Sequence, residues 1–335
     1  MRAITGARSQ SGPEPAGQPQ AGRVPDFYIV GHPKCGTTAL YEMLRRHPQV
    51  YMPAGKEPWY FAQELHVRTP PRPGGTPRTL DEYREWFADA RPDQRVGEAS
   101  VLYLWSRTAA ARIAQVQPQA QIVAVLREPA SFLRSLHLQF VQSYVETEND
   151  LRRALALEPE RRAGRRVPAH TYWPDALRYS EHVRYVEQLR RYHETFGRER
   201  VKVLIYDDYR ADNEATVREV LRFLGVDEQA PLAAREVNPT VRARSQRLHA
   251  AVHAVTVGRG PLARTVKAGA KRLTPHRVRR SALRATQRHL VFASPREPDE
   301  ALTRELRARY RGEVEALSEY IGRDLVREWG YDAVS

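Results

Sequence analysis

Short apolar runs alternate with stretches of helical periodicity along this chain. The runs at residues 26–30, 122–126 and 201–206 are rich in β-branched and aromatic side chains, which predicts buried strands. Apolar residues at helical spacing predict helices between residues 40 and 47, at about 130–146, at 176–196, at 213–224 (ended by Gly225) and at 302–323. Strands that alternate with helices are typical of an α/β fold, so we expect a central parallel β-sheet flanked by helices.

The length and composition predict a globular protein of one or two domains. The chain has 335 residues, of which 41% are hydrophobic, and this is enough for a sizeable core. Residues 1–24 are rich in Pro, Gly, Gln and Ser, which indicates a disordered tail before a domain over residues 25–335. No apolar run resembles a signal peptide or a membrane span, so we expect a cytoplasmic protein. The single cysteine, Cys35, excludes an intrachain disulfide and a multi-cysteine metal site.

The positive charge is concentrated late in the chain. The net charge is +14, and residues 237–296 contain fourteen Lys or Arg but no Asp or Glu. Scattered apolar positions make the segment at about 242–290 compatible with amphipathic helices. Two interpretations stay open: a lid that docks on an anionic membrane, where a lipid-linked substrate would lie, or a solvated helical face. Nucleic acid is not an expected partner, because aromatic residues do not interleave with the charge.

The strongest local signal is the loop Gly31–Thr38, which connects the first predicted strand to the first predicted helix. Such a loop forms an anion site, because backbone N–H groups converge there and the helix dipole adds partial positive charge. Lys34 supplies a full charge, and Thr37 and Thr38 are expected to supply hydroxyl donors and to cap the helix. The loop differs from a Walker A loop, because Gly36 is followed by Thr37 where that motif has its lysine.

Two segments resemble the nucleotide-binding motifs of sulfotransferases that use 3′-phosphoadenosine-5′-phosphosulfate (PAPS). The first resembles the 5′-phosphosulfate loop of that family and consists of Pro33, Lys34, Cys35, Gly36, Thr37 and Thr38. The second resembles the motif that holds the 3′-phosphate and consists of Arg127, Pro129 and Ser135. An Arg offers a bidentate fork to phosphate, and a Ser in the following helix adds a hydroxyl. The resemblance also implies that Arg242 or Arg244 closes over the same phosphate.

The chain resembles a bacterial member that is closer to the carbohydrate and heparan-type sulfotransferases than to the cytosolic phenol and steroid type. The carbohydrate type carries its base as a Glu in a KExHFF-like segment, and residues 56–61, KEPWYF, are similar to it with Trp in place of His. The resemblance implies that Glu57 is the general base, that Lys34 stabilises the leaving phosphate and that Lys56 contacts the bridging oxygen or the acceptor.

Other candidate residues concern the acceptor. Residues 97–103 resemble the family's EKSPxY stretch, but Ala99 stands where the family has Lys, which weakens the case for a glycosaminoglycan acceptor. Three side chains are candidates for the wall of the acceptor cleft: Ser100, Tyr103 and Trp173. A core position is the alternative for Trp173. Three of the histidines, His32, His137 and His182, are expected in loops or on helix surfaces rather than as the base.

The resemblance implies a P-loop-like sheet and an enzyme that moves the sulfuryl group of PAPS to a hydroxyl by in-line displacement. A carbohydrate, a lipid or a secondary metabolite could carry that hydroxyl. No metal is expected, because cationic side chains and the helix N-terminus neutralise the phosphosulfate. Two alternatives stay open: a P-loop nucleotide kinase, which the missing Walker lysine disfavours, and a non-catalytic protein that binds anions or membranes through its basic segment.

Overall fold

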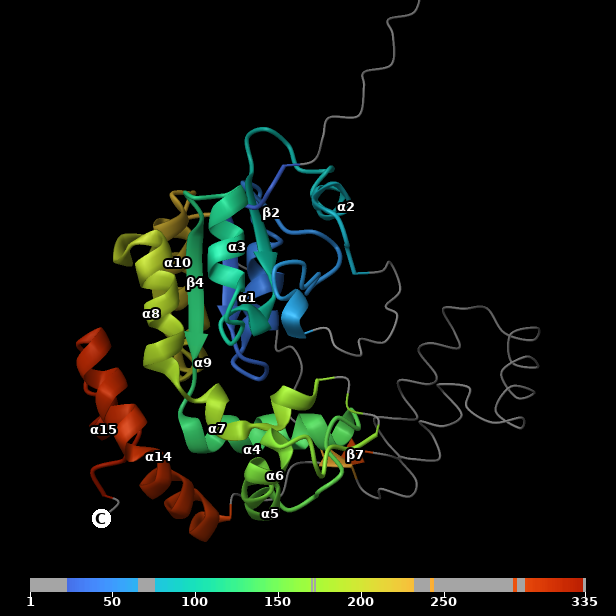
Figure 1. The fold of residues 1–335 in the computed structure, drawn as a ribbon. Coiled ribbons are helices and arrows are strands. Elements are labelled where there is room, and N and C mark those ends of the chain that lie inside the picture. Colours follow the sequence, from blue (N-terminus) through green and yellow to red (C-terminus); the bar gives the residue numbers. More distant parts are fainter. Residues whose placement is uncertain are drawn as a thin grey trace, which may run out of the picture.

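The computed structural model describes residues 23–65, 76–169, 171, 173–231, 242–243, 292–293 and 299–333. Within these residues, a sheet of five parallel strands forms the centre of the fold, in the order β2-β3-β1-β4-β5 (Figure 1). The strands are β1 (Phe27–Gly31), β2 (Val50–Tyr51), β3 (Arg95–Ala99), β4 (Gln121–Leu126) and β5 (Val201–Ile205). Every residue of β1 is buried, as expected for the middle strand of a parallel sheet.

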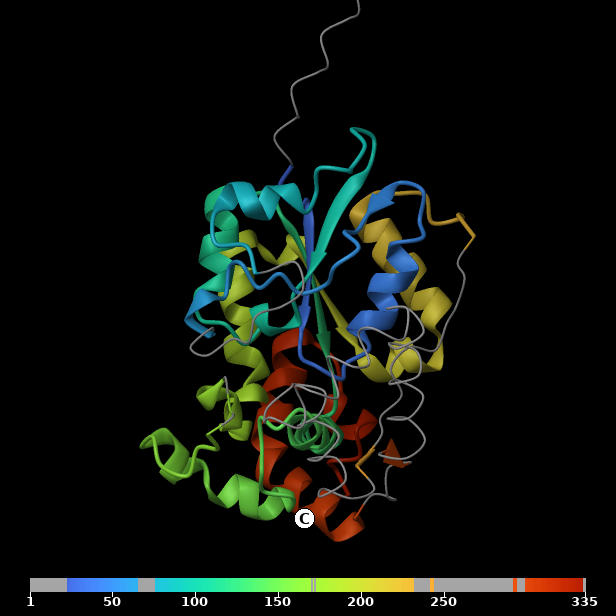
Figure 2. The ribbon, with the colours of Figure 1, turned by 90° about the vertical axis from the view of Figure 1, so that its right-hand side faces the viewer.

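Helices cover both faces of this sheet. Figure 2 shows α1 (Thr37–Leu44), α9 (Tyr206–Ala211) and α10 (Asn213–Leu224) on one face, and α3 (Ala109–Val116) and α8 (Tyr185–Phe196) on the other. Beyond the end of β4 lies α4 (Pro129–Gln142), and α14 (Glu300–Ile321) packs against both α4 and α8. The shorter described helices are α2 (Leu80–Glu85), α5 (Leu151–Ala156), α6 (Glu158–Arg162), α7 (Tyr179–His182) and α15 (Leu325–Glu328). The predicted α/β architecture is confirmed.

The carboxyl ends of the strands meet at one edge of the sheet, where open α/β sheets bind ligands. At this edge β1 leads into the loop 32–36, β4 into Arg127 and β5 into Tyr206. Gly31 ends β1 with φ 148°, and a Cβ at this position would lie 2.6 Å from the carbonyl oxygen of Val125. Only glycine therefore allows β1 to approach β4 so closely where the loop begins.

Several elements agree closely with the sequence pattern. The structure confirms the strands β1, β4 and β5 and the helices α1, α10 and α14, and Gly225 ends α10 in the left-handed conformation with φ 70°. β2 and β3 were not predicted. β2 has two residues, and β3 contains Gly97 and Glu98, so neither forms an apolar run.

The helix predicted at 176–196 is wrong as one continuous element. The chain forms a 3₁₀ turn, η3 (Pro174–Leu177), followed by α7 and α8, because Arg178 and Arg184 have non-helical backbone angles. The breaks turn His182 into the interior, and the Tyr185 hydroxyl donates to the carbonyl oxygen of Arg127 over 2.8 Å. The tertiary contacts of the segment thus override its helical periodicity.

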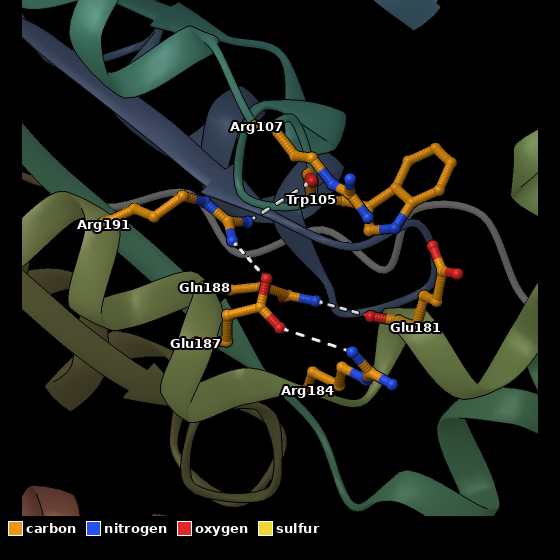
Figure 3. Close-up of a pocket in the computed structure, with 7 residues that line it drawn as sticks. All are labelled: Trp105, Arg107, Glu181, Arg184, Glu187, Gln188 and Arg191. Carbon is orange, nitrogen blue, oxygen red and sulfur yellow. Dashed lines mark hydrogen bonds and ion pairs between the residues drawn. The ribbon is translucent and has the colours of Figure 1, made fainter.

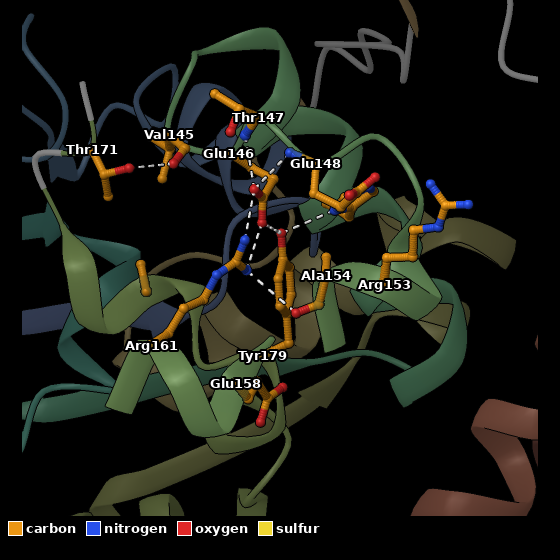
Figure 4. Close-up of polar contacts among 12 residues, drawn as sticks. Val145, Glu146, Thr147, Glu148, Arg153, Ala154, Glu158, Arg161, Thr171 and Tyr179 are labelled. Atoms are coloured by element: carbon orange, nitrogen blue, oxygen red, sulfur yellow. Dashed lines mark hydrogen bonds and ion pairs between the residues drawn. The ribbon is translucent and has the colours of Figure 1, made fainter. Parts of the chain in front are cut away.

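The helix predicted at about 130–146 ends earlier, at Gln142. Glu146 lies in the interior, where its carboxylate accepts two hydrogen bonds from the guanidinium of Arg161, at 2.7 and 2.8 Å (Figure 4). Both side chains are fully buried, and the Tyr179 hydroxyl and the backbone N–H of Thr147 also donate to the carboxylate. This bidentate, buried ion pair attaches α6 to the end of α4.

Two further strands lie at the ends of the basic segment. β6 (Arg242–Ala243) and β7 (Phe292–Ala293) pair in the antiparallel sense, with Arg242 opposite Ala293. The predicted amphipathic helices at 246–290 and most of the predicted tail, residues 1–22, lie outside the described residues.

Candidate functional site

The loop between β1 and α1 has an unusual backbone. Lys34 and Gly36 both lie in the left-handed region, with φ 70° and 79°. Gly36 is the N-cap of α1, so the expectation that Thr37 and Thr38 cap this helix is wrong. They are its first residues, and the N-cap has no side chain to accept a hydrogen bond. The free N–H groups of the first turn are left for a ligand or for solvent.

Lys34 and Cys35 behave differently within this loop. Burial, and next the positive charge of Arg127, lower the pKa of the Lys34 ammonium below its usual value. An anion placed beside Lys34 would therefore be stabilised by an ammonium that is only partly hydrated. The Cys35 thiol is fully buried, which raises its pKa to about 12. Cys35 is thus a protonated packing residue under the loop rather than a nucleophile.

Arg127 connects the turn after β4 to this loop. Its Nη1 donates to the carbonyl oxygen of Lys34 over 2.7 Å, and its Nε donates to Ser131 Oγ over 3.0 Å. The guanidinium lies 4.6 Å from the centre of the Tyr206 ring, a cation–π contact that restricts it from one side. Nη2 makes no hydrogen bond within the described residues and remains available for an anion. The contacts of Ser131 and Tyr206 were not predicted from the sequence.

Ser135 lies two turns into α4 and is 4% exposed. Its Oγ has no hydrogen-bond partner within the described part of the chain. Buried hydroxyls are nearly always hydrogen-bonded, so an orphaned hydroxyl on the helix that follows Arg127 calls for a partner from outside the described chain.

The segment 56–61 brings a carboxylate and an ammonium close to the same loop. Lys56 Nζ lies 2.9 Å from Glu57 Oε1 and donates to Thr37 Oγ1 over 3.5 Å. The other carboxylate oxygen, Glu57 Oε2, accepts a hydrogen bond from the indole of Trp59 over 3.2 Å. The side chain of Glu57 is 25% exposed. Each oxygen of the Glu57 carboxylate thus has a hydrogen-bond partner, and the side chain remains partly exposed to solvent.

The three candidate acceptor-wall residues all contact this segment. Ser100 Oγ accepts from the backbone N–H of Trp59, and the Tyr103 hydroxyl accepts from that of Phe61, each over 3.2 Å. Ser100 and Tyr103 are fully buried, so they support the segment from behind. The Trp173 ring packs edge-on against Trp59 with 4.5 Å between the ring centres, and Trp173 is 9% exposed.

Three histidines were expected in loops or on helix surfaces. His32 lies in the loop after β1, but it is buried, and the helix-surface position expected for the other two is wrong, because His137 on α4 and His182 on α7 are also buried. His32 Nε2 lies 2.8 Å from Gln188 Oε1, and the Gln188 amide nitrogen donates to the carbonyl oxygens of Glu181 and His182. Since the amide orientation is fixed, His32 donates from Nε2. Burial lowers the pKa of His32 to about 3 and that of His182 to about 4, so both rings are neutral.

A small hollow lies beside α8, with an empty volume of about 260 Å³ (Figure 3). Its lining residues are Trp105, Arg107, Glu181, Arg184, Glu187, Gln188 and Arg191. Two of its arginines, Arg184 and Arg191, pair with Glu187, the latter at 3.0 Å. None of the sequence-derived candidates lines this hollow.

The C-terminal segment supports the turns after β4 and β5. The Trp329 indole donates to Asp207 Oδ2 over 3.1 Å, and the Tyr331 hydroxyl donates to Glu128 Oε1 over 2.8 Å. Burial raises the pKa of Asp207 and the Arg127 guanidinium partly opposes this rise. The sequence carried no signal for these contacts, because they join residues far apart in the chain.

The two arginines expected to close over the 3′-phosphate are Arg242 and Arg244. Arg244 lies outside the described residues, and for Arg242 only the backbone in β6 is described.

Among the described residues, no group of three or more His, Cys, Asp or Glu side chains is arranged to hold a metal ion. Within the described part of the chain, no helix has the length and apolar character needed to cross a membrane.

Comparison with known proteins agrees with this geometry. Residues 24–247 match the family described as "Sulfotransferase domain". Mouse carbohydrate sulfotransferase 15 is 30% identical over 156 residues, covering 36% of this chain and 28% of that protein. Mouse heparan sulfate glucosamine 3-O-sulfotransferase 3B1 is 30% identical over 109 residues, covering 32% and 25%. The matches thus span about a quarter of the length of these curated relatives.

A solved structure is similar over nearly the whole chain. The sulfotransferase from Alicyclobacillus acidocaldarius superposes with a TM-score of 0.63 at 27% sequence identity, covering 91% of this chain and 98% of that one.

Proposed function

The chain belongs to the sulfotransferase family and is a transferase, and we propose that it moves the sulfuryl group of PAPS to an acceptor hydroxyl. The observation that carries the choice of donor is the orphaned, buried hydroxyl of Ser135 on the helix that follows Arg127. A nucleotide with a 3′-phosphate would supply the missing partner for Ser135 and for Nη2 of Arg127.

The residues present fit the rest of this donor. The first turn of α1 offers backbone N–H groups to the 5′-phosphosulfate, and Lys34 adds a partly desolvated ammonium. Thr37 and Thr38 add hydroxyls. Each hydrogen bond to a charged phosphate oxygen contributes roughly 1.5–3 kcal/mol before desolvation, so these groups favour a nucleotide with a charged 5′ group. The preference for a 3′-phosphate, and thus for PAP over ADP, comes from Arg127 and Ser135.

In the proposed reaction Glu57 accepts the proton of the acceptor hydroxyl as the oxygen attacks sulfur. The bond from sulfur to the bridging phosphate oxygen breaks, and 3′,5′-bisphosphoadenosine (PAP) leaves with the electron pair. Lys34 stabilises the charge that grows on the leaving phosphate. Lys56 contacts both Glu57 and Thr37, so a single ammonium connects the base to the anion-binding helix.

The acceptor is proposed as a class only. The relatives are named for action on carbohydrate and heparan sulfate, which favours a carbohydrate hydroxyl. Ala99 replaces the lysine of the EKSPxY stretch, so a less anionic acceptor than a glycosaminoglycan is expected. We further propose that residues 25–335 form one sulfotransferase domain, that the protein is cytoplasmic, and that its basic segment contacts anionic membranes peripherally.

Calorimetric titration tests the proposed donor. PAP is expected to bind at least tenfold more tightly than ADP, because only PAP offers a phosphate to Ser135 and Arg127. Equal affinities for the two nucleotides would rule out the proposed donor. PAPS-dependent transfer that survives a metal chelator would support a reaction without a metal.

A further inference from the structure

Glu98 is a fully buried carboxyl at the end of β3, beside Tyr28 of β1. The Tyr83 hydroxyl of α2 donates to Oε2 over 3.0 Å, while Oε1 has no hydrogen-bond partner within the described residues. Glu98 also forms no ion pair with any described residue. Burying a carboxyl without a cation is costly, so its presence at this position needs a specific reason.

The neighbouring segment, residues 57–61, depends on external support. Glu57 and Trp59 both adopt the left-handed conformation, with φ 65° and 57°. Non-glycine residues hold this conformation only where surrounding contacts impose it. The first contact is the hydrogen bond from the N–H of Glu57 to the carbonyl oxygen of Ala99, over 3.1 Å. The segment is thus attached to the residue that follows Glu98.

Two hydroxyls provide the other attachments. Ser100 Oγ and the Tyr103 hydroxyl each accept a hydrogen bond from a backbone N–H of this segment over 3.2 Å. Each hydroxyl then has its own hydrogen left to donate. Burial raises the pKa of Glu98 to about 7, and the Ser100 and Tyr103 hydroxyls oppose that rise. Glu98 Oε1 is thus a buried acceptor without a donor among the described residues, and two buried hydroxyls of the residues that follow it in the chain each have a hydrogen to donate.

We propose that Glu98 is a positioning residue for the base. By accepting from Ser100 and Tyr103, it keeps their lone pairs turned toward the segment 57–61 and so fixes the carboxylate of Glu57. The inference rests on the proposed role of Glu57. An amide at position 98 would replace one acceptor oxygen by a donor nitrogen, so the hydroxyls of Ser100, Tyr103 and Tyr83 would compete for the single remaining oxygen.

The test compares Glu98→Gln with Tyr83→Phe as the matched control. Tyr83 binds the same carboxyl but holds no N–H of the segment. Hydrogen exchange of peptides covering residues 57–61 should be at least about tenfold faster in Glu98→Gln and unchanged in Tyr83→Phe. Ser100→Ala and Tyr103→Phe each remove one attachment, so they should resemble Glu98→Gln. They keep the inference testable if Glu98→Gln does not fold.

Turnover and binding complete the test. With a desulfated heparan oligosaccharide as the acceptor probe, Glu98→Gln should lower kcat about tenfold while leaving KM for PAPS and the Kd of PAP within about twofold. Combining Glu98→Gln with Tyr103→Phe should cost little more than either change alone, because both act on one network. Unchanged exchange at 57–61 would overturn the inference. Faster exchange with unchanged kcat would support the positioning role and instead contradict Glu57 as the base.

Discussion

The Arg127 guanidinium donates a hydrogen bond to the carbonyl oxygen of Lys34 over 2.7 Å. The two residues come from turns that follow adjacent strands, β1 and β4, so the bond joins the two proposed phosphate sites. It also helps to hold Lys34 in its left-handed conformation. Arg127 therefore shapes the phosphosulfate loop in addition to any phosphate that it binds.

Arg127 and Ser135 should differ in how they affect nucleotide binding. Arg127→Ala should weaken the binding of both PAP and ADP. The loop loses its hydrogen bond to Arg127, which affects both nucleotides, and the 3′-phosphate of PAP also loses a partner. Ser135→Ala should weaken PAP about tenfold and leave ADP unchanged, since the orphaned hydroxyl serves only the 3′-phosphate. Calorimetry of both nucleotides against both variants measures this. An equal loss of ADP affinity in the two variants would contradict the assignment.

Variants at Lys34 and Glu57 should distinguish effects on nucleotide binding from effects on the chemical step. Lys34→Ala should weaken PAP binding and also lower kcat, because the ammonium contacts the nucleotide before and during transfer. Glu57→Gln keeps the shape of the side chain but cannot accept the proton. It should leave PAP affinity almost unchanged and reduce kcat roughly 10²–10⁴-fold. The measurement is PAP release with a working acceptor, and near-normal turnover by Glu57→Gln would place the base elsewhere.

His32 should make the protein less stable in mild acid. Its pKa of about 3 in the folded state lies below the ordinary 6.5. At pH values between these two, the unfolded chain binds a proton on His32 that the folded chain does not bind. The cost is about 2 kcal/mol on going from pH 6.5 to pH 5. His32→Asn removes the titrating ring, so its stability should fall less over this range. Chemical denaturation of the nucleotide-free protein at both pH values checks this.

Glu98 should shift stability in the opposite sense. Its folded pKa of about 7 lies above the ordinary 4.5, so the folded state keeps a proton that the unfolded state releases. This contribution is lost as the pH rises toward 7. Glu98→Gln should therefore be more stable relative to wild type at pH 8 than at pH 5. The same denaturation series measures it, and a pH-independent difference would mean that Glu98 does not titrate as described.

The basic segment can be removed for a test of membrane binding. Arg242 and Ala293 are paired across β6 and β7, so a short Gly-Ser linker can replace residues 244–291 without separating the two strands. Wild type should cosediment with vesicles rich in phosphatidylserine at low salt and dissociate as salt rises. The shortened chain should not cosediment, and its PAP affinity reports whether the rest is intact. Absence of wild-type cosedimentation at low salt would favour a solvated face.

Features carried by local sequence were predictable, and features made by distant contacts were not. The loop 31–38 and the helix ended by Gly225 depend on neighbouring residues, and both follow the sequence pattern. The buried position of His32 depends on a hydrogen bond with Gln188, 156 residues away, and no residue near His32 in the sequence indicates that partner. A periodicity analysis therefore treats such a histidine as an ordinary loop residue.

The candidate site also contains residues that local sequence identifies and residues that only distant contacts reveal. Lys34, Arg127 and Glu57 lie within short motifs, so the sequence can single them out. Glu98 lies beside a recognisable stretch, but its role depends on hydroxyls that meet only after β3, η2 (Val101–Tyr103) and α2 have packed together. A charged residue in a strand pattern is also normally expected to face solvent.

The hydrogen bond between Tyr331 and Glu128 joins residues 203 positions apart. During synthesis, the turn that carries Arg127 therefore leaves the ribosome long before the residue that completes its support. A nascent chain would hold an unfinished nucleotide site through most of translation, and early nucleotide binding could not guide its folding. Because Tyr331 contacts the turn that carries Arg127, a fusion partner attached at the C-terminal end of the chain begins close to the proposed donor site.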